Sequence, residues 1–134
     1  MKKFVLTLCI AAFAAPLMAQ AKPSLWTYPR VDQGLFDMGV AWGIQDNCER
    51  IGERTFYGLT FALSLQSYAQ EQGYSSQEVK AFYRSSEEKQ KLRERVTNYL
   101  EDQGLDTETP NALCNYGDQQ IAEGTQVGKF LRKN

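Results

Sequence analysis

The chain has 134 residues, 15 Lys and Arg against 16 Asp and Glu for a formal net charge of −1, and no histidine. This slightly acidic balance excludes a strongly basic surface for nucleic acid or for anionic lipid. The absence of histidine excludes Ser-His and Cys-His nucleophilic systems and the commonest zinc sites.

Residues 1–21 read as a secretory signal peptide, with Lys2 and Lys3 before an apolar run and a small-residue cleavage site that ends at Ala21. Cleavage is expected after Ala19 or after Ala21. The apolar run is shorter than the ~20 residues that span a bilayer, so we do not expect a membrane anchor. The sequence therefore predicts export to the periplasm and no membrane span after signal cleavage.

Residues 22–30 are expected to form an extended N-terminal arm, because two prolines interrupt a segment that has no helical period. Trp26 and Tyr28 are expected to dock this arm on the body of the protein. Residues 31–134 are expected to form a single helical domain, which is long enough to bury one core.

A first helix is predicted over residues 31–45, where apolar residues recur at spacings of four, three and four: Val31, Leu35, Met38 and Trp42. Gly39 and Gly43 each weaken this helix by roughly 1 kcal/mol relative to alanine. We interpret both glycines as points where a neighbouring element approaches closely. Asp46 and Asn47 are predicted to end this helix and to cap the next one.

A central helix is predicted over residues 48–72, with Cys48 in its first turn and Gly73 as its left-handed end. On a helical wheel, its charged and hydroxyl residues fall on one narrow stripe, and apolar residues fill most of the remaining surface. This pattern predicts a helix that is packed on several sides and around which the chain is arranged.

Further helices are predicted over residues 75–84 and 85–104, because each opens with a serine cap followed three residues later by glutamate. A last helix is predicted from Pro110 to Leu131, with a break near Gly124 as the alternative. No strand-like alternation is found. The predicted fold class is therefore all-α, a single compact domain of about five helices stapled by one disulfide.

Cys48 and Cys114 are the two cysteines outside the signal segment, and they are predicted to form that disulfide because exported chains meet an oxidising compartment. Closing a loop of this length stabilises a fold by about 4 kcal/mol in the chain-entropy model. The bond would also remove both thiols as nucleophiles.

Four residues are candidates for a structural or binding role: Arg54, Asp46, Trp42 and Tyr74. Arg54 lies nearer the apolar arc of its helix than the charged stripe, so we expect it to be partly buried and paired with Asp46 or with an acid on another helix. This structural pairing is favoured over ligand binding. If the protein is an accessory subunit of a membrane complex, an apolar binding patch is expected on the first helix, at Trp42 and at Trp26 of the arm. Tyr74 is expected at the edge of the core, with its hydroxyl in water.

No catalytic residue, metal or cofactor is predicted. Asp32, Asp37 and Asp46 lack the spacing of a calcium loop, and no glycine-rich phosphate cradle precedes a helix. Adjacent acids in the predicted helices point about 100° apart, so they do not converge on a substrate.

The order and spacing of several short motifs resemble an uncharacterised family of small exported proteins from alphaproteobacteria, known as a domain of unknown function. The resemblance covers about residues 44–131, and the paired cysteines are its firmest part. It rests on these motifs: Asp46-Asn47-Cys48-x-x-Ile51-x-x-Arg54, Gly73-Tyr74-Ser75 with Glu78, Tyr99-Leu100 before Gly104, Leu113-Cys114-x-x-Gly117, and Gly128. The resemblance implies a periplasmic helical domain with one disulfide, and it carries no activity.

The sequence thus favours a periplasmic, non-catalytic helical protein that binds another periplasmic or membrane-associated protein. Three alternatives remain: an acid-stress periplasmic chaperone, a carboxylate-dependent envelope hydrolase, and an accessory subunit of a membrane complex. The first two rest on architecture or residue type alone, which is a weak basis for function.

Overall fold

The computed structural model describes residues 20–106 and 108–134. The predicted signal segment, apart from its last two residues, lies outside these ranges. The described elements are a 3₁₀ turn, six α-helices and two short strands: η1 (Leu25–Thr27), α1 (Pro29–Asp46), β1 (Ile51–Glu53), α2 (Thr55–Glu71), α3 (Ser76–Arg84), α4 (Ser86–Asp102), α5 (Pro110–Glu123), α6 (Gln126–Phe130) and β2 (Leu131–Lys133). The predicted all-α class is confirmed.

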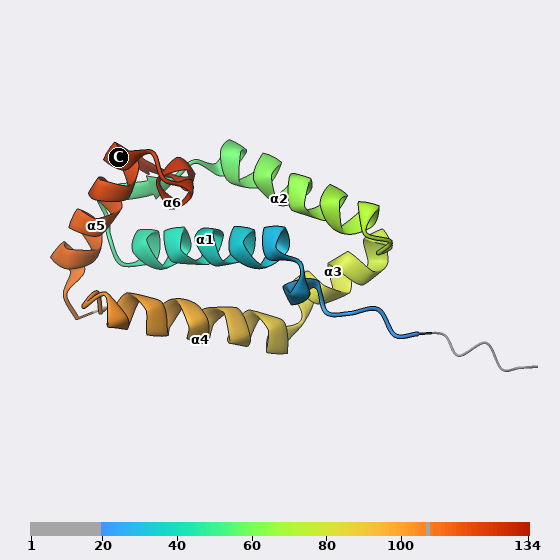
Figure 1. Cartoon of the computed structure of the whole chain (residues 1–134). Helices are drawn as coiled ribbons and strands as arrows, with labels where there is room; N and C mark the ends of the chain where they lie inside the picture. The colour runs from blue at the N-terminus through green and yellow to red at the C-terminus, as the bar shows by residue number, and fades with distance from the viewer. Residues whose placement is uncertain (1–19, 107) are drawn as a thin grey trace, which may run out of the picture.

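Helix α1 lies at the centre of the fold, with α2 on one side and α4 on the other (Figure 1). Its residues Val31, Val40 and Ile44 are at most 1% exposed. Helices α5 and α6 close one end of this three-helix layer. The prediction that residues 48–72 form the central helix is therefore wrong, and the central position belongs to the helix before it.

Glycines let both neighbours approach α1 closely. A Cβ atom at Gly34 would lie 3.0 Å from Leu65 of α2. A Cβ atom at Gly39 would lie 2.8 Å from Val96 of α4, and one at Gly43 would lie 3.1 Å from Leu100. Gly39 and Gly43 therefore mark close packing, as the sequence indicated, and the packing offsets their low helix propensity.

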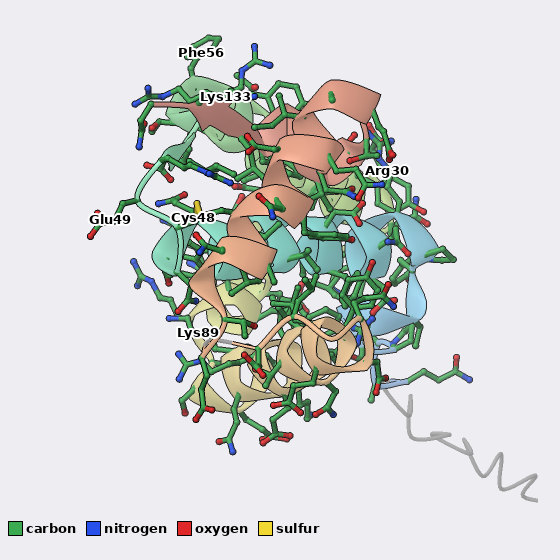
Figure 2. All side chains as sticks on the ribbon, turned by 90° about the vertical axis from the view of Figure 1, so that its left-hand side faces the viewer. Arg30, Cys48, Glu49, Phe56, Lys89 and Lys133 are labelled. Atoms are coloured by element: carbon green, nitrogen blue, oxygen red, sulfur yellow. A yellow bond between two sulfur atoms is a disulfide. The ribbon has the colours of Figure 1, made fainter. Side chains whose placement is uncertain are left out.

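The disulfide between Cys48 and Cys114 joins the segment after α1 to α5, with 5.4 Å between the Cα atoms (Figure 2). Cys48 does not lie in a helical turn. The segment that follows it forms β1, which pairs antiparallel with β2, Ile51 opposite Lys133 and Glu53 opposite Leu131. Helix α2 begins only at Thr55, so the predicted start at residue 48 is wrong. The Asp46-Asn47 pair ends α1 but does not cap α2.

The other helix boundaries follow the predicted turn chemistry. Ser75 and Glu78 form the reciprocal capping box of α3, and the Ser85 hydroxyl caps α4. Gly73, Gly104 and Gly124 all adopt positive φ after a helix, the conformation that glycine reaches most easily. The last predicted helix breaks at Gly124 into α5 and α6, which is the alternative that the glycine indicated.

The arm is less extended than predicted. Residues Leu25–Thr27 form η1, and α1 already begins at Pro29, since proline suits the first position of a helix. The Trp26 ring lies 5.1 Å from the Phe82 ring of α3, between centroids. Leu25 is buried in a second small core with Val31, Ala69, Tyr74 and Val79. The arm is thus packed on the body.

The disulfide is expected to supply a large share of the stability, because it closes a 66-residue separation in the chain. Replacing both cysteines, Cys48→Ser with Cys114→Ser, should lower the free energy of unfolding by up to about 4 kcal/mol in urea titrations. As a control without mutation, the urea midpoint of the oxidised wild type is compared with that of the wild type treated with reductant. An unchanged urea midpoint after reduction would contradict this expectation.

Two glycines offer a matched test of packing. A Cβ atom at Gly128 would lie 1.9 Å from the Gln120 carbonyl oxygen, whereas one at Gly58 would meet nothing within 4 Å. We expect Gly128→Ala to destabilise the protein by about 2–3 kcal/mol, because α6 must move away from the α5 backbone. Gly58→Ala should stabilise α2 by about 0.5–1 kcal/mol. Thermal unfolding followed by circular dichroism measures the change in stability of each variant. Equal changes for Gly128→Ala and Gly58→Ala would refute the packing argument.

Candidate functional site

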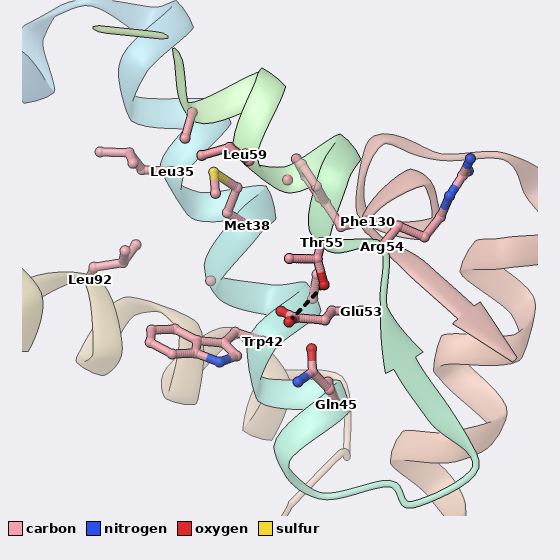
Figure 3. A pocket seen from close by; sticks show the side chains of 14 residues that line it. Leu35, Met38, Trp42, Gln45, Glu53, Arg54, Thr55, Leu59, Leu92 and Phe130 are labelled. Carbon is pink, nitrogen blue, oxygen red and sulfur yellow. Dashed lines mark hydrogen bonds between the residues drawn. The ribbon is translucent and has the colours of Figure 1, made fainter. Parts of the chain in front are cut away.

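An apolar groove with a volume of about 430 Å³ lies between α1 and α2. Figure 3 shows side chains from both helices converging on it, joined by Leu92 of α4 and Phe130 of α6. The apolar and small residues that line it are Leu35, Met38, Gly39, Ala41, Trp42, Gly58, Leu59, Ala62, Leu92 and Phe130. We call this feature the α1/α2 groove.

Polar groups stand at one end of the α1/α2 groove. Gln45, Glu53, Arg54 and Thr55 line it there, and the Thr55 hydroxyl donates a hydrogen bond of 3.0 Å to Glu53. The Arg54 guanidinium points away from the other lining side chains (Figure 3). Only one carboxylate therefore lines this groove, which is insufficient for the paired carboxylates of a glycosidase-like site.

Helix α2 leaves much of its apolar surface exposed. Of the four large hydrophobic side chains that are exposed in the described part of the chain, three belong to α2: Phe56 is 81% exposed, Leu59 57% and Leu63 51%. Phe56 points outward from the body in Figure 2. We call these three residues the α2 crest. Within α2, whose residues are all described, only Leu65 and Ala69 are buried.

The exposure of the α2 crest corrects the predicted packing on several sides. The helical wheel identified a hydroxyl-bearing stripe but could not show which part of the remaining surface α1 and α6 would cover and which part would stay exposed. A different signal in the sequence does mark the crest. No charged residue occurs between Thr55 and Gln70, in a chain that is 23% charged. Exposed helices normally carry charges, so an uncharged run of this length is the signal that marks the exposed apolar surface of α2.

Trp42 is the fourth exposed hydrophobic residue, at 65%. It separates the α1/α2 groove from a second groove of about 560 Å³ between α1 and α4, and it lines both. Asp46, at the end of α1, is exposed and lines this second groove together with Lys89, Arg93 and Glu101. Trp42 thus lines the same groove as Leu59 of the α2 crest, while Asp46 lines only the second groove.

Arg54 is not buried as expected. It is exposed, it lies over the Tyr57 ring at 5.7 Å, and it forms no ion pair with any described residue. The expected pairing with Asp46 is absent because residues 51–53 form β1 instead of a helical turn. This strand places Arg54 beside β2, where its backbone N–H donates to the Phe130 carbonyl oxygen at 2.7 Å.

Tyr74 holds the N-terminal arm. It is buried, and its hydroxyl donates to the Pro23 carbonyl oxygen, so this hydroxyl is bonded to protein rather than to water. The Tyr28 ring packs edge-on against it at 5.9 Å between centroids. Burial, with the hydrogen bond to Tyr28 as a smaller cause, raises the pKa of Tyr74 to about 12. This residue therefore has a structural role in the described protein.

An ion pair completes the contact of the arm. The Lys22 ammonium lies 2.8 Å from the Glu78 carboxylate, and the Ser75 backbone N–H donates to the same carboxylate at 2.6 Å. These bonds, first the one from Lys22, lower the pKa of Glu78 to about 2. Trp26 donates from its indole nitrogen to Glu88 on α4. Carboxylates of α3 and α4 thus hold both ends of the arm.

The described ranges contain neither a candidate metal site nor a helix that could span a membrane. Over residues 20–106 and 108–134, no group of three or more histidine, cysteine or acidic side chains is placed to hold a metal ion. None of the helices described is both long and apolar enough to cross a membrane.

Comparison with known proteins gives one match. A family model described as a family of unknown function (DUF5333) matches residues 23–132. No curated protein and no solved structure matches the chain. The match spans the arm, all six helices and both cysteines.

The contact between Glu78 and Lys22 predicts a pH-dependent stability. Because folding lowers the pKa of Glu78 from 4.5 to about 2, its contribution is complete above pH 4.5 and disappears as the pH falls to about 2. Glu78→Gln keeps the capping geometry but removes this charge. The melting temperature of this variant should therefore lie below that of the wild type at pH 7, and the two should converge near pH 2.

The exposed carboxylate of Glu71, at the end of α2, provides the control. It forms no ion pair among the described residues, so Glu71→Gln should leave the melting temperature nearly unchanged at pH 7. An equal difference in melting temperature between wild type and Glu78→Gln at pH 2 and at pH 7 would show that the Glu78 carboxylate does not hold the arm.

Proposed function

The chain belongs to the family of unknown function DUF5333, and we propose that it is a periplasmic, non-catalytic protein that acts by binding another protein through the α2 crest and the α1/α2 groove. The observation that carries this proposal is the uncharged apolar surface of α2. Exposed apolar patches of this kind mark interaction sites, and interface cores are depleted of charge.

A protein fits this surface better than a small molecule does. A ligand in the α1/α2 groove would contact Leu59 and Trp42 but would leave Phe56 and Leu63 in water, since neither lines the groove. A partner that covers the crest as well as the groove would bury all four side chains. Removing this apolar surface from water would favour the complex.

A membrane surface is a poorer partner than a protein. Helices that lie on membranes carry lysine and arginine along their polar face. Helix α2 has neither residue, and Arg54 stands only at its N-terminal end. The described surface beside the crest thus lacks the attraction to anionic lipid that such helices use.

The partner is expected to present a helix. Leu35, Met38 and Trp42 recur at spacings of three and four along one side of the groove, and Leu59 and Ala62 do so along the other. Grooves with this periodicity accept an apolar helix whose contacts recur in the same way. An accessory subunit of a membrane complex would use the same face, so that alternative is one form of this proposal.

The disulfide supports the location. Bonds of this type persist in oxidising compartments, such as the periplasm, and are rare in the bacterial cytosol. Together with the signal peptide expected over residues 1–21, this makes export the natural assignment. The lack of histidine and the single carboxylate in the groove support a role without catalysis.

Site-specific photocrosslinking tests the binding face. A benzophenone side chain in place of Leu63 should crosslink a dominant protein when the mature chain is irradiated in its own periplasm. The same side chain in place of Asn98, an exposed residue of α4, is the matched control and should capture little.

A second substitution identifies the interaction that drives binding. Leu59→Lys should reduce the crosslinked product from position 63 at least about tenfold, because the interface would have to bury a charge. Asn98→Lys, which adds the same charge on α4, should not reduce it. Equal crosslinking from positions 63 and 98, or an unchanged yield with Leu59→Lys, would contradict the proposal.

A further inference from the structure

We infer that the protein bound at this face is a second copy of the chain, with α2 packed antiparallel against α2 of the other copy about a twofold axis. This inference rests on the proposed function, since it names the partner of the same site. It follows from the arrangement of the α2 crest and the α1/α2 groove on one helix, and from the distribution of charge around them.

A twofold interface requires one surface that is complementary to itself. The described face meets this requirement because it contains both projections and a hollow. Phe56 and Leu63 project from α2, and the α1/α2 groove lies directly beside them, with Leu59 belonging to both. In a dimer with a twofold axis, the crest of each copy would lie against the groove of the other copy.

The spacing of the α2 crest sets the register of the two helices. In an antiparallel pair with its axis between Leu59 and Thr60, Phe56 of one copy lies opposite Leu63 of the other. The same register places Leu59 opposite Thr60, so apolar residues meet apolar or small residues along the contact. Ala62, which lines the groove next to Leu63, leaves room for the large Phe56 ring.

The charge distribution favours a second copy over an unrelated partner. Any charge near a twofold axis meets its own copy, and this like-charge contact opposes association. Helix α2 has no charged residue from Thr55 to Gln70. Helix α4, by contrast, has nine charged residues between Glu87 and Asp102, although it packs on the other side of the same α1. The α2 positions beside the inferred axis therefore carry no charge, and Glu53 and Arg54, which line the groove, stand before the first residue of α2.

The surface is of the size that a weak dimer needs. Phe56 and Trp42, at 81% and 65% exposed, together present on the order of 300 Å² of accessible surface. The two exposed leucines and the groove lining add to this. A specific interface buries about 800 Å² on each partner, and smaller ones belong to transient complexes. The expected dissociation constant is therefore on the order of micromolar.

Sedimentation equilibrium of the mature chain tests the inference directly. Over concentrations from about 1 to 200 µM, the apparent mass should rise from one chain to two. Phe56→Lys should weaken the dimer at least tenfold, because it places a charge beside Leu63 of the other copy and brings two like charges into one interface. Asn98→Lys, on the exposed face of α4, should leave the dimerisation constant unchanged.

Disulfide trapping tests the axis. Thr60 is exposed and lies next to the inferred axis, so Thr60→Cys should form a covalent dimer on mild oxidation. Asn98→Cys should remain a monomer under the same conditions. Covalent dimers from both positions alike would overturn the inferred register.

Different experimental outcomes would refute the inferred dimer and the proposed function. If the wild type stays monomeric at every concentration while the crosslinker at position 63 captures a different protein, the second copy is refuted and the proposed function stands. If a dimer forms and resists Phe56→Lys, the dimer uses another surface and the inference is overturned. If the chain is monomeric and position 63 captures nothing, both are refuted.

Discussion

The close approach of α2 and α4 to α1 is the constraint on which the rest of the structure depends. Gly34 opens one side of α1 to Leu65, and Gly39 and Gly43 open the other side to Val96 and Leu100. Side chains at these positions would push the neighbours outward, which would expose the main core that Val40 and Ile44 share with residues of α4, α5, α6 and β2. The glycines cost helix propensity locally, and interhelical packing offsets that cost.

A second constraint positions the start of α2. The disulfide fixes the segment after α1 to α5, and the pairing of β1 with β2 then directs the chain away from the core before α2 begins. Helix α2 packs against α1 and α6, with Leu65 and Ala69 buried and the α2 crest in solvent. The α1/α2 groove lies between these two helices, whose contact is less extensive than the contact between α1 and α4.

These constraints leave large apolar side chains exposed on α2 and at Trp42 of α1, whereas α4 is densely charged. Exposed phenylalanine, leucine and tryptophan side chains promote non-specific association, so a monomer gains nothing by keeping them together. The proposed partner would cover these side chains. The paired surfaces proposed for two copies would give each exposed side chain a neighbour and would place no charge at the centre of the contact.

The sequence by itself determined the class of the fold, most helix boundaries and the disulfide, because capping serines, left-handed glycines and paired cysteines act through their immediate neighbours or through the redox compartment. It also marked Gly39 and Gly43 as packing positions. Only the tertiary structure decided which helix is central, that residues 51–53 form a strand, and that Arg54 and the α2 crest are exposed. Each of these depends on elements far away in the chain: β2 supplies the backbone partners of β1, and α1, rather than α2, receives neighbours on both sides. A helical wheel records which residues share a face, but the topology determines which faces are covered.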